Sequence, residues 1–282
     1  MSNQPNVFSV VAGAPFFPSF VSALKQGRII KDFSIENPLA LSQIKIYTPT
    51  KRAARALEEA IIASSDGAAS FLPDIRPLGE MNWDNFFSFF SQPYTEFRQP
   101  IDKFERLLIL AFLVRSWKEN LPKALEKLFS DEEGTSHAST ADAIWLARDL
   151  CHLMDEMDIQ EISWEKVAAL PLENVSQWWQ VTFEFLKIIS CSWPQILEEF
   201  GCVNPEAWRN KLLRYQKQLL EFNPPQHPVI AVGFPSSLGA ISELLTTIAS
   251  LPKGAVVLPA IDGALNEEEW QKLGKDLSLI HI

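Results

Sequence analysis

Short apolar runs, each followed at once by a turn, constrain the fold of this chain more than any other feature. Val7 to Ala12 reads VFSVVA and leads into Gly13, and a helical pattern follows from Phe16 to Leu24. Ile44 to Tyr47 leads into a Thr-Pro-Thr turn and a helical pattern from Lys51 to about Ile62. Runs of this length and β-branched composition are typical of buried strands. Two strand–turn–helix units in succession predict parallel strands joined by crossover helices.

The same pattern returns near the end of the sequence. Strands are predicted from Val229 to Val232 and from Ala255 to Leu258, with a helix from Ser237 to Ser250 between them. From about Trp83 to Phe222, by contrast, apolar residues recur at intervals of three and four, which is typical of amphipathic helices. The clearest sets are Phe104, Leu107, Leu108 and Ala111, and Ala143, Leu146, Ala147 and Leu150.

Two further segments complete this pattern. Gln177 to Ile196 is apolar on nearly all sides, so we expect it to lie between other helices or under a partner. Asp131 to Thr140 is polar and is expected to be an exposed loop. The chain is therefore predicted to be an α/β domain, residues 1–80 and 223–276, whose sheet is interrupted by a helical insert domain, residues 81–222. Leu277 to Ile282 match the translation of a transposon end used in sequencing libraries, so we expect a non-native tail and a natural protein that continues past Asp276.

Composition restricts the possible partners. No stretch approaches the roughly 20 apolar residues of a bilayer span, and the N-terminus lacks the pattern of a signal peptide, so no membrane partner and a cytoplasmic location are expected. A formal net charge of -10 argues against a surface that coats duplex DNA, so any DNA contact must be local. Cys151, Cys191 and Cys202 include no close pair and are expected to be reduced and buried.

The turn after the first strand occupies the place of a phosphate-binding loop. Such a loop needs glycines that expose backbone N–H groups, and a Lys with a Ser or Thr for the γ-phosphate and Mg²⁺. Here the turn opens with Gly13, Ala14 and Pro15, the Lys is missing, and Pro15 and Pro18 each remove a backbone donor. This degenerate loop is predicted not to hold ATP. No catalytic, cofactor-binding or metal-binding residue is assigned in the chain.

Two charged patterns have alternative interpretations. Asp155 and Glu156 resemble the acidic pair that holds Mg²⁺ in nucleotide hydrolases, but helical spacing precedes them, so a solvated helix end is predicted. TPTKRAAR places Lys51, Arg52 and Arg55 at the start of a helix, where free N–H groups, a Thr hydroxyl and cations suit a nucleic-acid phosphate. A solvated amphipathic helix start is the alternative interpretation of that run.

A series of segments along nearly the whole chain carries a family resemblance. They are AGAPF (Ala12 to Phe16), IYTPTKRAARAL (Ile46 to Leu57), LPDIRPLGE (Leu72 to Glu80), WWQVTFEFL (Trp178 to Leu186), SWP (Ser192 to Pro194) and GAVVLPAID (Gly254 to Asp262). In this order they resemble the alphaproteobacterial AddB family, whose members are helicase–nuclease subunits in double-strand break repair. The GFPSSLGA segment from Gly233 to Ala240 departs from the GSTGS-like sequence of closer members, so no role is assigned to it.

The resemblance implies a RecA-like domain of the P-loop NTPase and superfamily-one helicase type, interrupted by a helical domain. It also implies that this half is catalytically degenerate and that a partner subunit, AddA, supplies the motor. TPTKRAAR falls where such helicases place the motif Ia segment that contacts single-stranded DNA, so the predicted DNA-binding residues are Thr48, Thr50, Lys51 and Arg52. Gly233 and Phe234 follow the strand where an active helicase has its acidic Mg²⁺ pair.

The family's nuclease domain lies far C-terminal of residue 282, and its Mg²⁺ site and iron–sulphur cluster are therefore not expected in this chain. The first function hypothesis is accordingly a DNA-contacting, non-motor part of an end-resection and recombination complex, without a complete ATPase or nuclease site. The alternatives are an independent nucleotide-binding α/β enzyme, which ATP binding would distinguish, and a structural module whose helical domain, in a chain with nine tryptophans, packs against a partner.

Overall fold

The computed structural model describes residues 5–30, 39–65, 71–80, 98–119, 140–168, 177–235 and 239–260. The chain divides into two compact units, one of residues 1–89 and 211–282 and the other of residues 90–210. We call them the α/β unit and the helical unit. The chain returns from the helical unit to the α/β unit inside helix α9 (Pro205–Phe222). The first residues of α9 belong to the helical unit, and the remainder belongs to the α/β unit.

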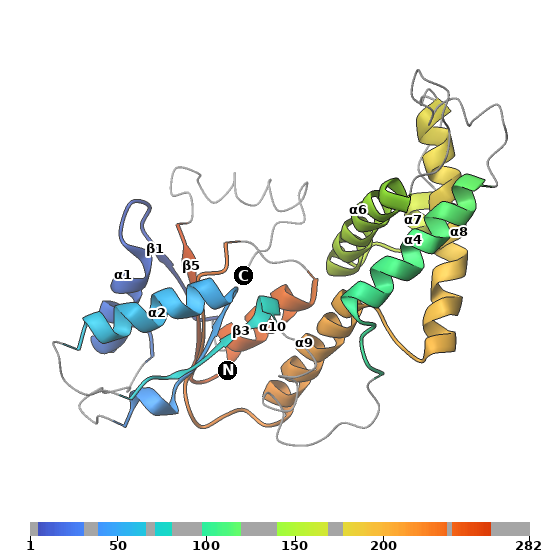
Figure 1. The fold of residues 1–282 in the computed structure, drawn as a ribbon. Helices are drawn as coiled ribbons and strands as arrows, with labels where there is room; N and C mark the ends of the chain where they lie inside the picture. The colour runs from blue at the N-terminus through green and yellow to red at the C-terminus, as the bar shows by residue number, and fades with distance from the viewer. Residues whose placement is uncertain are drawn as a thin grey trace, which may run out of the picture. The chain divides into compact units, whose positions relative to one another are not determined.

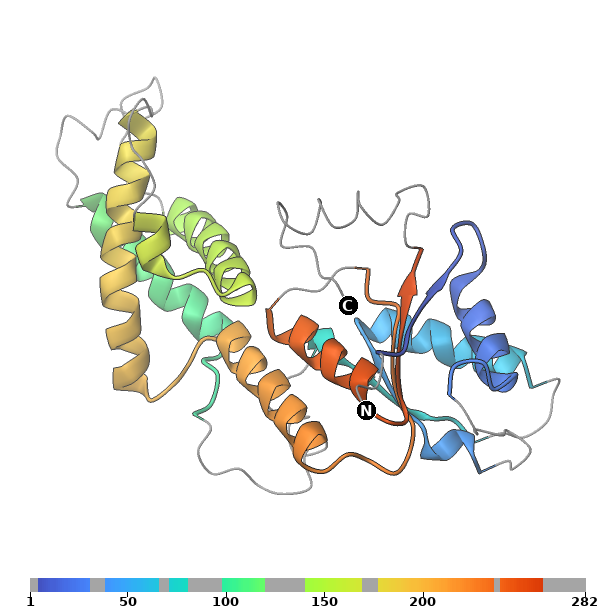
Figure 2. The same ribbon diagram turned by 180° about the vertical axis from the view of Figure 1, so that it is seen from behind.

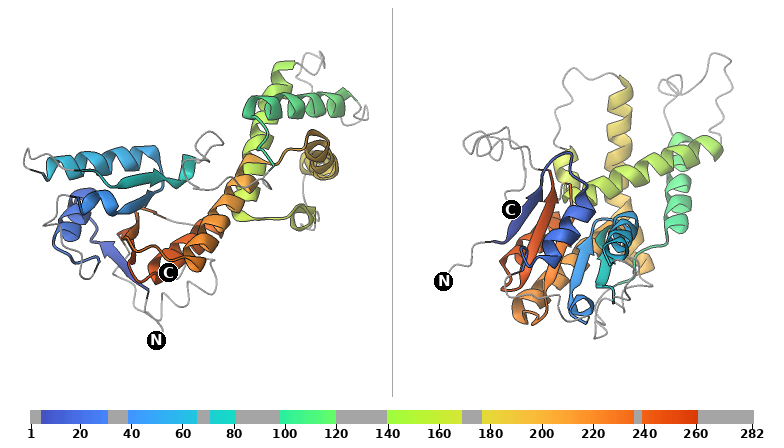
Figure 3. Two further views of the ribbon diagram at one scale, coloured as in Figure 1. Left: turned by 90° about the horizontal axis from the view of Figure 1, so that it is seen from below. Right: turned by 90° about the vertical axis from the view of Figure 1, so that its left-hand side faces the viewer.

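A five-stranded, all-parallel sheet forms the centre of the α/β unit (Figure 1). Its strands are β1 (Val7–Val10), β2 (Lys45–Thr48), β3 (Asp74–Pro77), β4 (Val229–Val232) and β5 (Gly254–Pro259). Their order in space is β1-β5-β4-β2-β3, so β1 lies beside the last strand of the chain (Figure 3). The predicted α/β fold with a parallel sheet is confirmed. Its RecA-like identity stays a prediction.

Helices cover both faces of the sheet, as Figures 1 and 2 show from opposite sides. On one face lie α1 (Phe16–Lys25) and α2 (Lys51–Ala63), and on the other lie α10 (Gly239–Ser250) and the later part of α9. Side chains alternate along each strand. Ile46 therefore packs under α1 and α2, whereas the next residue, Tyr47, packs toward α9 and α10. Strands buried on both faces are apolar throughout, which explains the continuous apolar runs in the sequence.

The helical unit is built from α4 (Lys103–Glu119), α6 (Thr140–Gln160), α7 (Trp164–Ala168), α8 (Gln177–Phe200) and the first turns of α9. Its core contains Leu110 and Val114 of α4, Ala147 of α6, and Ile189 and Trp193 of α8, all at most 1% exposed. The helical periodicity of this stretch is confirmed. Whether the unit is the helical insert domain of a helicase stays a prediction.

Some expectations need correction. β1 ends at Val10, and Val11 is 79% exposed in the following turn. β3 was not predicted from periodicity, because it has only four residues, of which two are charged and one is proline. All three cysteines are free thiols, but none is fully buried: Cys151 and Cys202 are partly exposed, and Cys191 is exposed. It lies two residues from Ile189 and from Trp193, and two helical residues span more than half a turn, so it faces away from the core.

The remaining elements are the short 3₁₀ helices η1 (Leu41–Gln43) and η2 (Leu78–Glu80). The loop predicted between Asp131 and Thr140, except for its last residue, lies outside the described residues. The predicted tail from Leu277 to Ile282 also lies outside them.

Candidate nucleic-acid interface

The candidate site lies where two neighbouring strands send their helices to opposite faces of the sheet. β2 pairs with β4, but α2 follows β2 onto one face and α10 follows β4 onto the other. Open α/β sheets form a crevice at the carboxyl ends of such strands, and ligands characteristically bind there. In this chain that position brings together the turn after β2, from Thr48 to Thr50, and Gly233 with Phe234 after β4.

Two threonines hold the turn after β2 in shape. Thr48 is fully buried, and its hydroxyl donates to the backbone carbonyl of Thr50 over 3.3 Å. Thr50 has an extended backbone and caps α2, because its hydroxyl oxygen accepts the backbone N–H of Ala53 over 3.1 Å. Of the two threonines predicted to bind DNA, only Thr50 is exposed. Thr48 therefore stabilises the conformation of the turn through its buried hydroxyl.

Gly79 supports the same turn from the neighbouring strand. Its backbone N–H donates to the carbonyl of Pro49 over 2.9 Å. A Cβ atom added at Gly79 would lie 2.4 Å from that carbonyl oxygen, closer than any real contact. Only glycine allows the two backbones to approach this closely. Periodicity alone gives no sign of this contact, because it joins residues of two different strand–turn segments.

The start of α2 presents positive charge to solvent. Lys51 and Arg52 are its first two residues, both are exposed, and the first turn contains no acidic residue. The backbone N–H groups of a first helical turn have no partner within the helix, and Thr50 satisfies only that of Ala53. The positive end of the helix dipole adds to the charge of the two side chains. A phosphate group is the chemical species that this arrangement suits.

The turn after β1 is poor in the donors that a nucleotide needs. Gly13 takes a positive φ of 86°, and the N–H of Ala14 already donates to the carbonyl of Val11 over 3.2 Å. Pro15 is the N-cap of α1 and provides no side-chain cap, and Pro18 occupies the third helical position. Because proline has no N–H, the first turn of α1 keeps only the N–H groups of Phe16 and Phe17. The predicted degenerate loop thus has few donors for a phosphate.

Aromatic rings fill the space between this turn and β4. Phe16 and Phe17 stack edge to face, with ring centroids 5.1 Å apart. A Cβ added at Gly233, which has a φ of 81°, would lie 3.3 Å from the Phe16 ring and 3.7 Å from the Phe17 ring. The residue after β4 is therefore a glycine beside two aromatic rings, and it is not an acidic residue. The sequence marks Gly233 as a departure from an acidic pair but does not reveal the ring contact.

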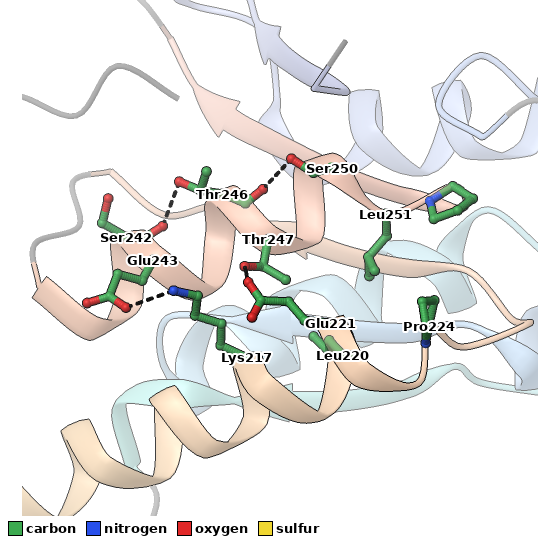
Figure 4. Close-up of a pocket in the computed structure, with 11 residues that line it drawn as sticks. Lys217, Leu220, Glu221, Pro224, Ser242, Glu243, Thr246, Thr247, Ser250 and Leu251 are labelled. Atoms are coloured by element: carbon green, nitrogen blue, oxygen red, sulfur yellow. Dashed lines mark hydrogen bonds and ion pairs between the residues drawn. The ribbon is translucent and has the colours of Figure 1, made fainter. Parts of the chain in front are cut away.

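A second concave region lies between α9 and α10 and has a volume of about 570 Å³ (Figure 4). Its polar side chains pair across it. Lys217 contacts Glu243 at 3.1 Å, and Thr247 donates to Glu221 over 3.2 Å. The cleft reaches Pro224 and Pro252, which precede β4 and β5, so it extends toward the amino ends of these strands, away from the crevice.

The acidic pair of the sequence lies in the helical unit, within helix α6 and not at the end of a strand. Glu156 is exposed, but the prediction of a solvated helix end is wrong for Asp155. Its carboxylate pairs with the guanidinium of Arg106, which is only 3% exposed. The described part of the chain has no cluster of three or more His, Cys, Asp or Glu side chains that could hold a metal ion. The described residues therefore do not fit the Mg²⁺ or iron–sulphur sites that the resemblance implies.

Comparisons with known proteins add no assignment. Among the described residues, no helix is both long enough and apolar enough to cross a membrane. No protein-family model matches the chain, and no curated protein matches it with statistical significance.

Proposed function

We propose that this chain is the N-terminal, catalytically degenerate helicase-like part of an AddB-type subunit. In this proposal it acts in double-strand break repair, by contacting single-stranded DNA and the AddA-type motor subunit during end resection. The observation that carries the proposal is the position of Thr50, Lys51 and Arg52 beside the carboxyl ends of the paired strands β2 and β4.

The local chemistry favours a phosphate of the DNA backbone as the group that is bound. Thr50 orders the first turn of α2, and Lys51 and Arg52 bring two cations to the positive end of the helix dipole. These groups read charge and not base identity, so binding is expected to be independent of sequence and sensitive to salt. The chain is acidic overall, and this agrees with a local contact rather than a broad basic surface.

The turns after β1 and β4 support assigning the motor activity to the AddA-type partner. Pro15 and Pro18 remove two donors where a phosphate-binding loop needs them, and Gly233 replaces a carboxylate after β4. Binding a strand while the AddA-type subunit hydrolyses ATP is a role that does not need those missing groups.

The test is a titration of labelled polythymidine and polyadenosine strands with the chain, alone and together with the AddA-type subunit, at low and near-physiological salt. The Lys51→Ala/Arg52→Ala variant should bind both strands about 10-fold more weakly at low salt. The slope of log affinity against log salt concentration should become shallower by roughly one, because two phosphate contacts are lost.

Arg28→Ala/Lys211→Ala is the matched control. It removes two exposed cations of the same α/β unit, outside the crevice, and changes the net charge equally. It should leave affinity and salt slope close to those of the wild type. Equal effects of the two double variants, or none from either, would mean that TPTKRAAR is a solvated helix start.

A further inference from the structure

A partly buried cluster of charged and amide side chains joins three helices inside the helical unit. We call this cluster the polar junction. Its members are Lys103 and Arg106 of α4, Asp155 and Asp158 of α6, Glu206, Arg209 and Asn210 of α9, and Asn204, which precedes α9. All of these residues belong to the helical unit, and the junction has no part in the proposed function.

Two of the three carboxylates in the junction have a cation of their own. Asp155 pairs with Arg106, and Glu206 pairs with Arg209 at 2.9 Å. Asp158 forms no ion pair in the described part of the chain. It is held by amides instead, since the Asn204 side chain hydrogen-bonds to its carboxylate and the Asn210 Nδ2 donates to its backbone carbonyl over 2.7 Å.

The amides connect Asp158 to the start of α9 and to the core. Asn204 directly precedes α9, and its Oδ1 accepts the indole N–H of the buried Trp193 over 2.8 Å. One carboxylate oxygen of Asp158, Oδ2, is buried and has no hydrogen-bond partner among the described residues. A buried ionised oxygen without a partner is costly, whereas a protonated carboxyl carries no charge and can donate its O–H.

We infer that the polar junction is a proton-binding switch, in which uptake of a proton by Asp158 tightens the packing of the first turns of α9 against α4 and α6. The charges that face Asp158 come from every helix around it. Arg106 favours its ionised form, whereas Asp155 and Glu206 oppose it.

The direction of the effect follows from the desolvation of this carboxyl. Burial is the largest cause that raises the pKa of Asp158, from 3.8 to about 6, and burial also raises the pKa of Glu206. A carboxyl with a folded pKa above its unfolded pKa binds protons more tightly in the folded state. Its stabilising contribution is complete below the unfolded value and is lost as the pH rises through the folded value. The junction should therefore loosen between about pH 4 and pH 7.

Hydrogen exchange of the whole chain, followed by mass spectrometry, tests this inference. After correction for intrinsic exchange, the amides of residues 206–210 and of the end of α6 should be about 10-fold better protected near pH 5 than near pH 7.5. Asp158→Asn keeps an oxygen for Asn204 but cannot ionise. In this variant protection should be high at both pH values and change by less than about 3-fold, with Glu206 causing the remainder.

Asp149→Asn, an exposed acid on the same helix, is the matched control and should retain the full pH dependence of the wild type. The inference is overturned if wild-type protection of these amides does not change with pH. It is also overturned if Asp158→Asn and Asp149→Asn show the same pH dependence. If Asp158→Asn loses protection at both pH values, the carboxylate stabilises the junction in its ionised form, and the inference is wrong.

Discussion

At the scale of single residues, glycines allow the candidate interface to form. Gly79 permits the close approach that supports Pro49, and Gly233 combines a positive φ with the Phe16 and Phe17 rings. Residues other than glycine rarely adopt a positive φ. At Gly233 the Phe16 ring also occupies the space that a side chain would need. Composition alone identifies neither requirement, because both depend on contacts between distant segments.

Two glycine substitutions separate these effects. Gly13 and Gly233 both have positive φ, but only Gly233 has a ring within 4 Å of the added Cβ. We expect Gly13→Ala to lower the free energy of unfolding by about 1 kcal/mol, the cost of the backbone conformation. Gly233→Ala should cost roughly 1 kcal/mol more, because the Phe16 ring must move. Urea unfolding of both variants measures the difference. Equal losses would show that the ring yields without cost.

At the scale of helices and strands, the sequence predicts those elements whose burial pattern is simple. β4 is buried on both faces and α2 has a strongly apolar side, so periodicity locates both to within about two residues. β3 has the sequence DIRP at a sheet edge, and its pairing with β2 is a tertiary effect that no local pattern reveals.

The candidate site was partly predictable for a similar reason. The cap and cations at the start of α2 are local features, and the sequence shows them directly. The position beside β4 is not local, since it depends on a strand order that brings Val229 next to Lys45. Asp155 illustrates the same limit. Its exposed neighbour Glu156 follows the helical pattern, whereas its own partner lies on another helix.

Two arginines on α4 should show how much burial matters to an ion pair. Arg106 is 3% exposed and pairs with Asp155, whereas Arg115 is 52% exposed and pairs with Glu119. Arg106→Leu leaves Asp155 partly buried without its cation and should cost roughly 2–4 kcal/mol in the free energy of unfolding. Arg115→Leu should cost less than about 0.5 kcal/mol. Similar losses in urea unfolding would indicate that the buried pair contributes no more than an exposed one.

At the scale of the whole molecule, the α/β unit is a parallel sheet with helices on both faces, and its described turn after β1 is poor in donors for a phosphate. The first turn of α1 has lost one donor to Pro18 and is capped by another proline. The rings of Phe16 and Phe17 lie against Gly233. A fold of this class carries function only through its site, and here the charged site is at α2.

Calorimetry should accordingly detect no saturable binding of Mg-ATP below the millimolar range, and a phosphate-release assay should detect no hydrolysis. The sequences of the two turns contain no Lys, Asp or Glu, and the first turn of α1 has few N–H donors. The Lys51→Ala/Arg52→Ala variant identifies the source of any residual heat. Heat that disappears in this variant comes from phosphate bound at α2. Micromolar affinity that persists in it would instead favour an independent nucleotide-binding enzyme.

The order of the strands also determines when the sheet can form during synthesis. Among the described strands, β1 pairs only with β5, which is the latest of them in the sequence. β2 pairs with β3, which ends at Pro77, and with β4, which begins only at Val229. The helical unit is continuous in sequence and emerges from the ribosome between them. Pairings between such distant segments form slowly. Strands that are synthesised early therefore keep unpaired edges until their partner strands are available. The helical unit is therefore expected to fold first, while the amino-terminal strands depend on chaperones until β4 and β5 have been synthesised.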